Sequence, residues 1–481
     1  MPKSHANAPL NTGPRRGFVT AMCLGYFLIL LDVTVVNVAL PAISSTFAVT
    51  GPPLAWTVDA YAIPLGALLL AAGSIGDRLG HRQIVCVGLL GVTLASVACA
   101  LAPTFAVLVV ARLVQGIAAG LMLPGTLALL TNAFPDPTAR SRAVAIWAAI
   151  GGAALPAGPL LGGILVNLFG VRSVFWLSVP LGLLALLGVM RTAPRTAPNR
   201  GQAVDLWGAV LSAAALGAFI AAVIEWERSS LLSAGLLLVA LVSLVLFWVH
   251  ERRHPDPMLS SAVIRRGRLM VPVLVAGVMN LCTLGILFVL TQALQSIHGL
   301  SALASGGAVL FLFIPTPLAA PLASRMVRWI GALPTAAIGA VIGAIGFIVL
   351  AITDLSFGPV LAIGLVLWGL GIGILVVGVV DAAMAALPDR SGTASGLSNT
   401  ARQVGGAVGV AICAALAGST ASPSTFLSHT DLLLITSAVL FVIAALACIG
   451  VQRRVLSRPS HTAPENTQSP DTGVNTVHEG H

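Results

Sequence analysis

Apolar stretches of roughly twenty residues recur along almost the whole chain and are separated by short polar segments. A helix of that length spans the hydrocarbon core of a bilayer. A transmembrane barrel would need short segments of alternating polarity, and runs such as 431–451 have no such alternation. The pattern therefore predicts an all-α membrane protein with about fourteen spanning helices. We place them at residues 18–40, 54–76, 83–102, 105–130, 142–167, 172–190, 206–224, 231–249, 270–296, 302–325, 333–353, 358–386, 397–419 and 431–451.

Polar segments divide these helices into two halves. A Pro- and Arg-rich segment at 191–201 and a charged segment at 250–268 bracket the seventh and eighth helices, which we interpret as an insertion. A short repeat supports two related halves, because FPDPTARSRAVA at 134–145 resembles LPDRSGTASGLS at 387–398. The predicted organisation is a cytoplasmic N-terminal tail at 1–17, an N-terminal six-helix bundle at 18–190, a linker with inserted helices 7 and 8 at 191–268, a C-terminal six-helix bundle at 269–451 and a disordered cytoplasmic tail at 452–481.

The composition, 57% hydrophobic and 9% charged, excludes a soluble domain, in which about a quarter of the residues carry charge. The net charge of +9 does not indicate nucleic-acid binding, because the arginines lie in alternate loops and not on one face. An excess of arginine in one set of alternating loops marks the cytoplasmic side of the membrane. We therefore predict a multi-pass protein of the cell (inner) membrane with both termini cytoplasmic. The arginine-rich set includes Arg15, Arg78, Arg140, Arg191 and Arg325, whereas the opposite set holds only Arg172 and Arg228.

Three charged residues lie inside predicted spans at a common depth. A charge in hydrocarbon costs about 2.5 to 3.5 kcal/mol, so each one is a functional candidate. Asp32, Asp59 and Arg112 lie roughly 8 to 12 Å below the predicted external surface, where one cavity would hold all three. Desolvation and a nearby cation shift the pKa of a carboxyl group in opposite directions, which poises an acid for proton transfer. We predict that Asp32 and Asp59 carry protons and that Arg112 sets their proton affinity; a static ion pair between helices is the alternative.

Two glycine-rich segments are candidates for moving parts. GSIGDRLGHR at 73–82 predicts a tight cytoplasmic turn that acts as a gate, with a solvated loop as the alternative. Its candidate gate residues are Gly73, Asp77, Arg78, Gly80 and Arg82. In GGAALPAGPLLGG at 151–163, prolines kink the helix and glycines allow close packing, although packing alone would also explain them. The residues concerned are Pro156, Gly158, Pro159, Gly162 and Gly163.

Two further charges are candidates for a gate or a substrate contact. Asp381 lies about five residues inside the cytoplasmic end of its predicted span, and Arg402 lies inside the next span. Asp205 comes directly before a predicted helix and is expected to cap its N-terminus.

Four motifs make the sequence resemble the major facilitator superfamily, specifically its fourteen-helix drug:proton antiporter branch. They are LDVTVVNVALP at 31–41, GSIGDRLGHR at 73–82, ARLVQGIAAG at 111–120 and AGPLLGG at 157–163. The resemblance implies a major facilitator fold of two six-helix bundles plus two inserted helices. It further implies proton coupling through Arg112 and Gln115, a role for Asn37 beside Asp32, and a hinge between the halves in the fifth helix.

The chain also departs from the family pattern. Val171 stands where the family usually has Trp, and Ser178 where it usually has Asn. The second-half counterpart of the gate motif, around Arg325 and Arg328, has no acid, so we expect the cytoplasmic latch to be asymmetric.

The expected function is a proton-coupled antiporter that exports small amphipathic drugs or antibiotics by alternating access. An uncoupled or uptake carrier for a small metabolite is the alternative. The six cysteines fall inside predicted spans, and no Walker, HExxH or CxxC pattern occurs, so we expect no enzyme, no metal and no cofactor, with the proton gradient as the energy source. The expected partners are protons, a small-molecule substrate and the lipid bilayer. The sequence leaves the oligomeric state open, a monomer included.

Overall fold

The structure, a computed structural model, describes residues 16–134, 136–194, 205–226, 228–253, 267–387 and 391–456. Within these ranges it is helical and contains no strand. In the same part of the chain, 13 helical segments are long and apolar enough to cross a membrane. The further helix α2 (Trp56–Leu79) has 24 residues. These helices confirm the predicted class of an all-α membrane protein.

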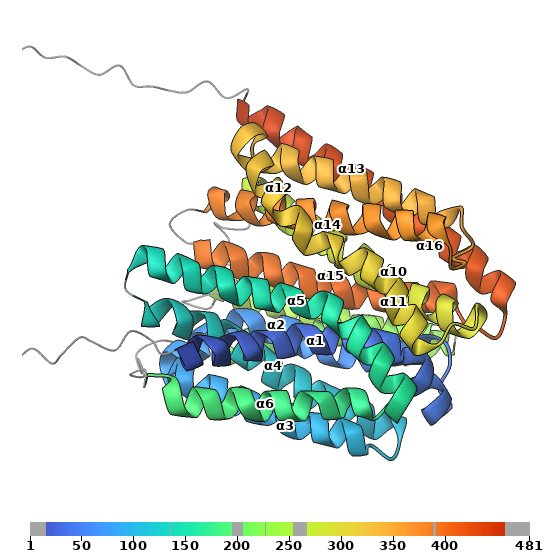
Figure 1. Ribbon diagram of the computed structural model, residues 1–481, viewed down its shortest axis with the longest axis horizontal. Coiled ribbons are helices and arrows are strands. Elements are labelled where there is room, and N and C mark those ends of the chain that lie inside the picture. Colours follow the sequence, from blue (N-terminus) through green and yellow to red (C-terminus); the bar gives the residue numbers. More distant parts are fainter. Residues whose placement is uncertain are drawn as a thin grey trace, which may run out of the picture.

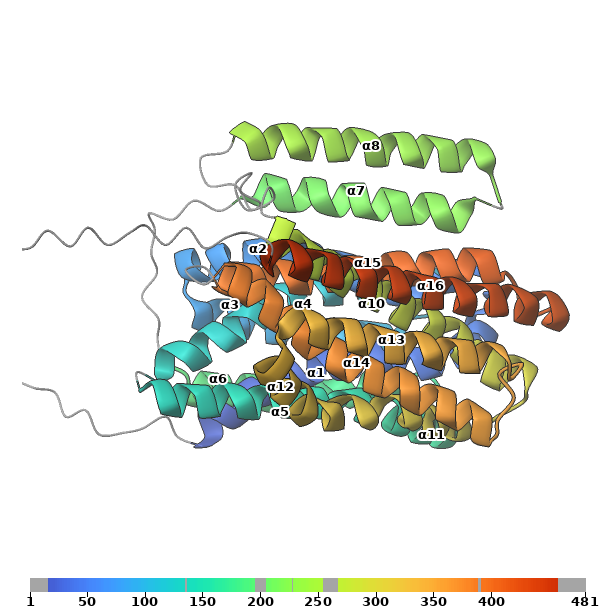
Figure 2. The same cartoon turned by 90° about the horizontal axis from the view of Figure 1, so that it is seen from above.

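The helices fall into two halves and an intervening pair (Figures 1 and 2). The first half consists of α1 (Arg16–Phe47), the short η1 (Pro52–Ala55), α2, α3 (His81–Leu101), α4 (Phe105–Ala133), α5 (Pro137–Phe169) and α6 (Ser173–Thr192). The intervening pair is α7 (Leu206–Glu225) and α8 (Ser230–Arg253). The second half consists of α10 (Gly267–Gln292), η2 (Ala293–Ile297), α11 (Ala302–Phe313), α12 (Pro315–Ile330), α13 (Ala332–Ala351), α14 (Pro359–Ala386), α15 (Ser391–Ala417) and α16 (Pro423–Leu456).

Several predicted boundaries differ from the structure by a few residues. The predicted span 302–325 corresponds to one candidate membrane span, Ala302–Ile330, which has a break at Ile314, where α11 ends at Phe313 and α12 begins at Pro315. Proline lacks the amide hydrogen that would continue α11, but it fits the first turn of a new helix. α16 reaches Leu456, past the predicted end at 451. The remainder of the predicted C-terminal tail, and the N-terminal residues before Arg16, lie outside the described residues.

α7 and α8 lie side by side along one flank of the bundle, as Figure 2 shows. α7 packs against α2 of the first half and α15 of the second, whereas α8 packs mainly on α7. Asp205 caps α7 through a 2.7 Å hydrogen bond from the Gly208 amide, as predicted. Its carboxylate also pairs with His250 at the end of α8 at 2.7 Å, which ties the two helices together. An apolar groove lined in part by Trp226, Leu237 and Leu416 separates this pair from α15.

The halves are joined at one end of the bundle. We call the end at which α1 begins the terminal face and the end at which α1 finishes the opposite face. Near the opposite face, α5 meets α11 so closely that a side chain on Gly163 would collide with Ala302 and Leu303. There Gln295 also donates a 2.9 Å hydrogen bond to the Val38 carbonyl, which links the second half to α1.

The clusters of buried hydrophobic side chains also show where the two halves are joined and where they are separate. One continuous cluster of buried side chains spans both halves toward the opposite face and includes Val35 of α1 and Phe288 of α10. Toward the terminal face, buried residues of the first half such as Met22 and of the second half such as Leu269 belong to separate clusters. In Figure 1, α12, α13 and α16 correspondingly slant away from α1, α3 and α6 toward the end where α1 begins. The described helices are therefore sealed together at the opposite face and parted toward the terminal face.

Candidate functional site

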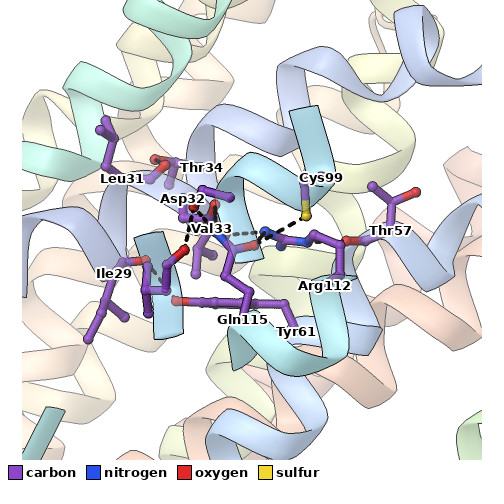
Figure 3. A network of polar contacts seen from close by, with 12 residues as sticks. Ile29, Leu31, Asp32, Val33, Thr34, Thr57, Tyr61, Cys99, Arg112 and Gln115 are labelled. Carbon is purple, nitrogen blue, oxygen red and sulfur yellow. Dashed lines mark hydrogen bonds and ion pairs between the residues drawn. The ribbon is translucent and has the colours of Figure 1, made fainter. Parts of the chain in front are cut away.

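A buried network joins Asp32 of α1 to Arg112 and Gln115 of α4 (Figure 3). Asp32 is 2% exposed, and Arg112 and Gln115 are fully buried. Nη1 of Arg112 forms an ion pair with the Asp32 carboxylate. The Gln115 amide donates to the other Asp32 oxygen at 3.1 Å and to the Ser96 hydroxyl of α3 at 2.9 Å. The structure thus brings together the two charges that the sequence placed at one depth.

The Arg112 guanidinium has contacts beyond its carboxylate partner. Its Nε donates to the Thr57 carbonyl of α2 at 2.9 Å, and its Nη1 donates to the Gln115 side-chain oxygen at 2.9 Å. The central guanidinium carbon of Arg112 lies 4.5 Å from the centroid of the Tyr61 ring, within cation–π range. A buried charge is costly unless its polar atoms have partners, and together with Asp32 these contacts supply them from α1, α2 and α4. Arg112 is therefore held by partners other than Asp32 as well.

Sequence reasoning missed Ser96, Cys99, Thr57 and Tyr61 as members of this network. The Cys99 thiol lies 3.8 Å from the Gln115 oxygen. A weak signal existed, because Ser96 and Cys99 lie three residues apart, the spacing of Arg112 and Gln115, and so share one helix face.

Asp59 does not join this network, so the expectation of one cavity with three charges is wrong. Asp59 is fully buried, and neither of its carboxyl oxygens has a hydrogen-bond partner among the described residues. It lies two turns from Gly66 on the same face of α2. A side chain at Gly66 would contact Gln403 and Val404 of α15. The face of α2 that carries Asp59 therefore packs against the second half.

The predicted gate residues lie at the terminal face. Gly80 has φ +96°, a left-handed conformation that favours glycine, and it forms the turn between α2 and α3. Asp77 pairs with His81 at 2.8 Å, and Arg82 donates to the Met190 carbonyl at 2.7 Å. Both contacts stay within the first half. Gly73 lies within α2, and Arg78 is exposed in its last turn.

The fifth-helix motif lies at the contact between α5, α1 and the second half. α5 continues as one helix through Pro156 and Pro159. A side chain on Gly158 would collide with Thr34 of α1, and one on Gly162 would crowd Val35. Gly163 faces α11, as described above. The motif therefore packs α5 against α1 on one side and against the second half on the other.

The remaining candidates lie apart from one another. The Asn37 amide donates to the Val33 carbonyl at 2.7 Å, and its side-chain oxygen is buried without a partner. Asp381 of α14 is partly buried. Arg402 of α15 is also partly buried, its Nε has no hydrogen-bond partner among the described residues, and it interacts electrostatically with Tyr26 of α1. Sequence reasoning missed Tyr26, which looks like an ordinary aromatic residue in an apolar run.

Two halves of membrane-length helices, the first of which holds a buried charged network, define the class of multi-pass membrane transporters. A profile of the Major Facilitator Superfamily matches residues 22–212 and 202–410, and the chain belongs to that superfamily. This assignment confirms the family resemblance drawn from the motifs and sets the chain among transporters and not enzymes.

Curated relatives carry names from drug and antibiotic resistance. The chain is 33% identical to multidrug resistance protein Stp of Mycobacterium tuberculosis, over 81% of this chain and 73% of that protein. It is 31% identical to the tetracenomycin C resistance and export protein of Streptomyces glaucescens, over 83% of this chain and 75% of that protein. It is 32% identical to the methylenomycin A resistance protein of Bacillus subtilis, over 81% of this chain and 85% of that protein.

Solved structures share the fold at low sequence identity. The human organic anion transporter MFSD10 superposes with a TM-score of 0.63 at 18% identity, covering 91% of this chain and 100% of that one. A POT family transporter in complex with a thioalcohol-conjugated peptide superposes with a TM-score of 0.64 at 15% identity, covering 92% and 96%. At these identities the comparison supports the fold alone.

Proposed function

We propose that this protein is a proton-coupled antiporter that exports small amphipathic drugs or antibiotics from the cytoplasm by alternating access. The observation that carries the proposal is the buried Asp32–Arg112 pair, which places an ionisable carboxyl group at membrane depth in a transporter whose relatives are named for drug resistance and export. The arginine-rich loops assign the terminal face to the cytoplasm and the opposite face to the outside.

In this orientation the described conformation is closed to the outside. Substrate enters from the cytoplasm between the parted ends of the halves, and the contact of α5 with α11 prevents its escape outward. Rocking of one half against the other then moves the opening to the external face. A proton taken up outside resets the carrier.

Asp32 is suited to carry that proton because its surroundings accommodate both ionisation states. As a carboxylate it accepts hydrogen bonds from Arg112 and Gln115. After protonation of Asp32, Arg112 keeps the Thr57 carbonyl, the Gln115 oxygen and the Tyr61 ring as partners, so its positive charge is still stabilised. Protonation therefore changes the charge of the site without dismantling it.

Asp59 is suited to link protonation to closure. An ionised carboxyl group without a partner is strongly disfavoured in a buried interface. The external contact of α2 with α15 therefore forms with Asp59 in its neutral, protonated form. Protonation from outside thus favours closure of the external face, and loss of the proton favours its reopening.

Everted membrane vesicles with an acidified lumen test the proposal. A proton motive force of 100 mV supplies about 2.3 kcal/mol per charge, enough for about 40-fold accumulation of an exported dye. We expect the wild type to accumulate at least one member of a panel of anionic, neutral and cationic lipophilic dyes, and each addition of that dye to alkalinise the lumen.

In the same assay, Asp32→Asn and Asp59→Asn should leave the dye near equal concentrations on both sides. Asp354→Asn is the matched control, because Asp354 is exposed in a loop at φ +46°, a conformation that asparagine tolerates. Normal dye-driven proton movement in both Asp32→Asn and Asp59→Asn would refute the coupling assignment, and dye transport without proton movement in the wild type would favour an uncoupled carrier.

A further inference from the structure

Three side chains from different helices lie at one depth on the cytoplasmic side of the Asp32 network. Tyr26 of α1, Trp147 of α5 and Arg402 of α15 each lie about three turns past the first residue of their helix. All three helices begin at the terminal face, so the residues share a level about 15 Å from that face. Two of them belong to the first half and one to the second.

The two aromatic residues form a preformed platform. The rings of Tyr26 and Trp147 are stacked, with centroids 3.9 Å apart and planes 10° from parallel. Gly151 of α5 packs directly against the Tyr26 ring, because a side chain at that position would collide with it. Both aromatic residues are partly exposed. The stacked rings therefore form a fixed aromatic surface on which the planar ring of a ligand can stack, and the two side chains lose little conformational entropy on binding.

Two buried donor atoms of these side chains have no acceptor among the described residues. The indole Nε1 of Trp147 and the Nε of Arg402 are buried and have no hydrogen-bond partner among the described residues. Arg402 is close enough to Tyr26 for an electrostatic interaction between their side chains. None of the ion pairs between described residues includes Arg402.

The described carboxylates closest to the centre are accounted for elsewhere. Asp32 is bound by Arg112 and Gln115, about two turns further from the terminal face. Asp59 lies still closer to the opposite face, without a hydrogen-bond partner among the described residues. A buried guanidinium Nε and a buried indole donor that lack acceptors in this part of the chain are costly, so the site favours a ligand that supplies negative oxygen atoms.

We propose that Arg402, Tyr26 and Trp147 form a substrate site for planar aromatic compounds that carry an anionic oxygen group, a carboxylate or a phenolate. The inference rests on the proposed export function and names its substrate class. The ring of the compound stacks on the Tyr26–Trp147 platform, and its anionic group accepts hydrogen bonds from Arg402. Since the platform belongs to the first half and Arg402 to the second, such a compound contacts both halves, and its binding is sensitive to their relative position.

Equilibrium binding to the purified full-length protein in nanodiscs tests this site without a proton gradient. The probes are 1-pyrenebutyrate and its neutral amide, 1-pyrenebutyramide, which differ only in the anionic group. The wild type should bind the acid about tenfold to a hundredfold more tightly than the amide, as expected for charge-assisted hydrogen bonds. Arg402→Gln should remove that preference while amide binding stays within about threefold of the wild type, which also shows that the variant is folded.

Further variants separate the two parts of the site. Arg402→Lys keeps the charge but not the planar fork of donors, so it should retain part of the preference for the acid. Trp147→Leu should weaken both probes by about threefold to tenfold, because it removes the platform and not the charge. Arg325→Gln, an exposed arginine of α12, is the matched control and should bind as the wild type does.

The proposal is overturned if the wild type binds acid and amide equally, if it binds neither probe, or if Arg402→Gln weakens both probes to the same extent. These outcomes are independent of proton coupling, because no gradient is present. Dye-driven proton movement in vesicles alongside any of them would leave the antiporter proposal intact and remove only this substrate class.

Discussion

At the scale of single residues, the two intramembrane acids of the first half have different surroundings and therefore different tasks. Asp32 lies in a network in which Arg112 and Gln115 satisfy its oxygens. Asp59 lies at a packing interface with no polar partner among the described residues. In the proposed mechanism, an acid of the first kind exchanges a proton while its site persists, whereas an acid of the second kind makes the contact between the halves depend on its proton.

Gln115 has a structural task that can be measured apart from transport. Its amide bonds Asp32 and Ser96 at once, so Gln115→Leu leaves a buried carboxylate oxygen and a buried hydroxyl without their donor. We expect the free energy of unfolding to fall by about 1 to 3 kcal/mol, read from thermal unfolding in detergent. Gln83→Leu is the control, because Gln83 is exposed on α3. Equal stability of the two variants would contradict the stabilising role of the network.

The sequence predicted the Asp32–Arg112 pair because charges are rare in apolar runs and helix geometry converts position into depth. The same reasoning placed Asp59 in the wrong surroundings, since depth alone does not say which face of α2 a residue occupies. Tyr26 and Trp147 were missed for another reason. An aromatic residue in an apolar run is usually core or lipid-facing, and only the approach of α1, α5 and α15 in space reveals the platform.

At the scale of helices, glycines fix which pairs approach closely. Gly306 of α11 lies against the Pro159 carbonyl of α5, where a side chain would collide with backbone. The adjacent Gly307 has open space beside it. α5 therefore meets α11 through one face of small residues, and the contact between the halves at the opposite face, external in the proposed orientation, depends on that face. The division of α11 from α12 escaped prediction because the hydrophobic run continues across Ile314, and only the prolines that follow end the helix.

The two neighbouring glycines give a matched pair of variants. Gly306→Val should push α11 away from α5, weaken the external seal and reduce dye accumulation in everted vesicles, whereas Gly307→Val should behave as the wild type. Labelling of Ala302→Cys by a membrane-impermeant thiol reagent should rise in the Gly306→Val background only. Similar labelling and transport in both backgrounds would show that this contact does not seal the external face.

At the scale of the whole molecule, the arrangement is asymmetric in two ways. The halves share a continuous core toward the opposite face and have separate cores toward the terminal face. The polar side chains of the proposed mechanism lie mainly in the first half, while the second half contributes Arg402 and the surface of α15 that packs against α2 near Gly66. α7 contacts both halves, at α2 and α15, beside the interface that changes in the proposed rocking motion.

The central claim is that the protein exchanges protons for substrate through Asp32, so that bound substrate favours the ionised form of Asp32, and proton release on substrate binding tests it most directly. Calorimetric titration of the purified protein with a dye exported in the vesicle assay, in two buffers of different ionisation enthalpy, counts the protons released. The account predicts that dye binding releases protons from the wild type and close to none from Asp32→Asn, which still binds the dye. Equal proton release by the variant, or none by the wild type, would contradict it.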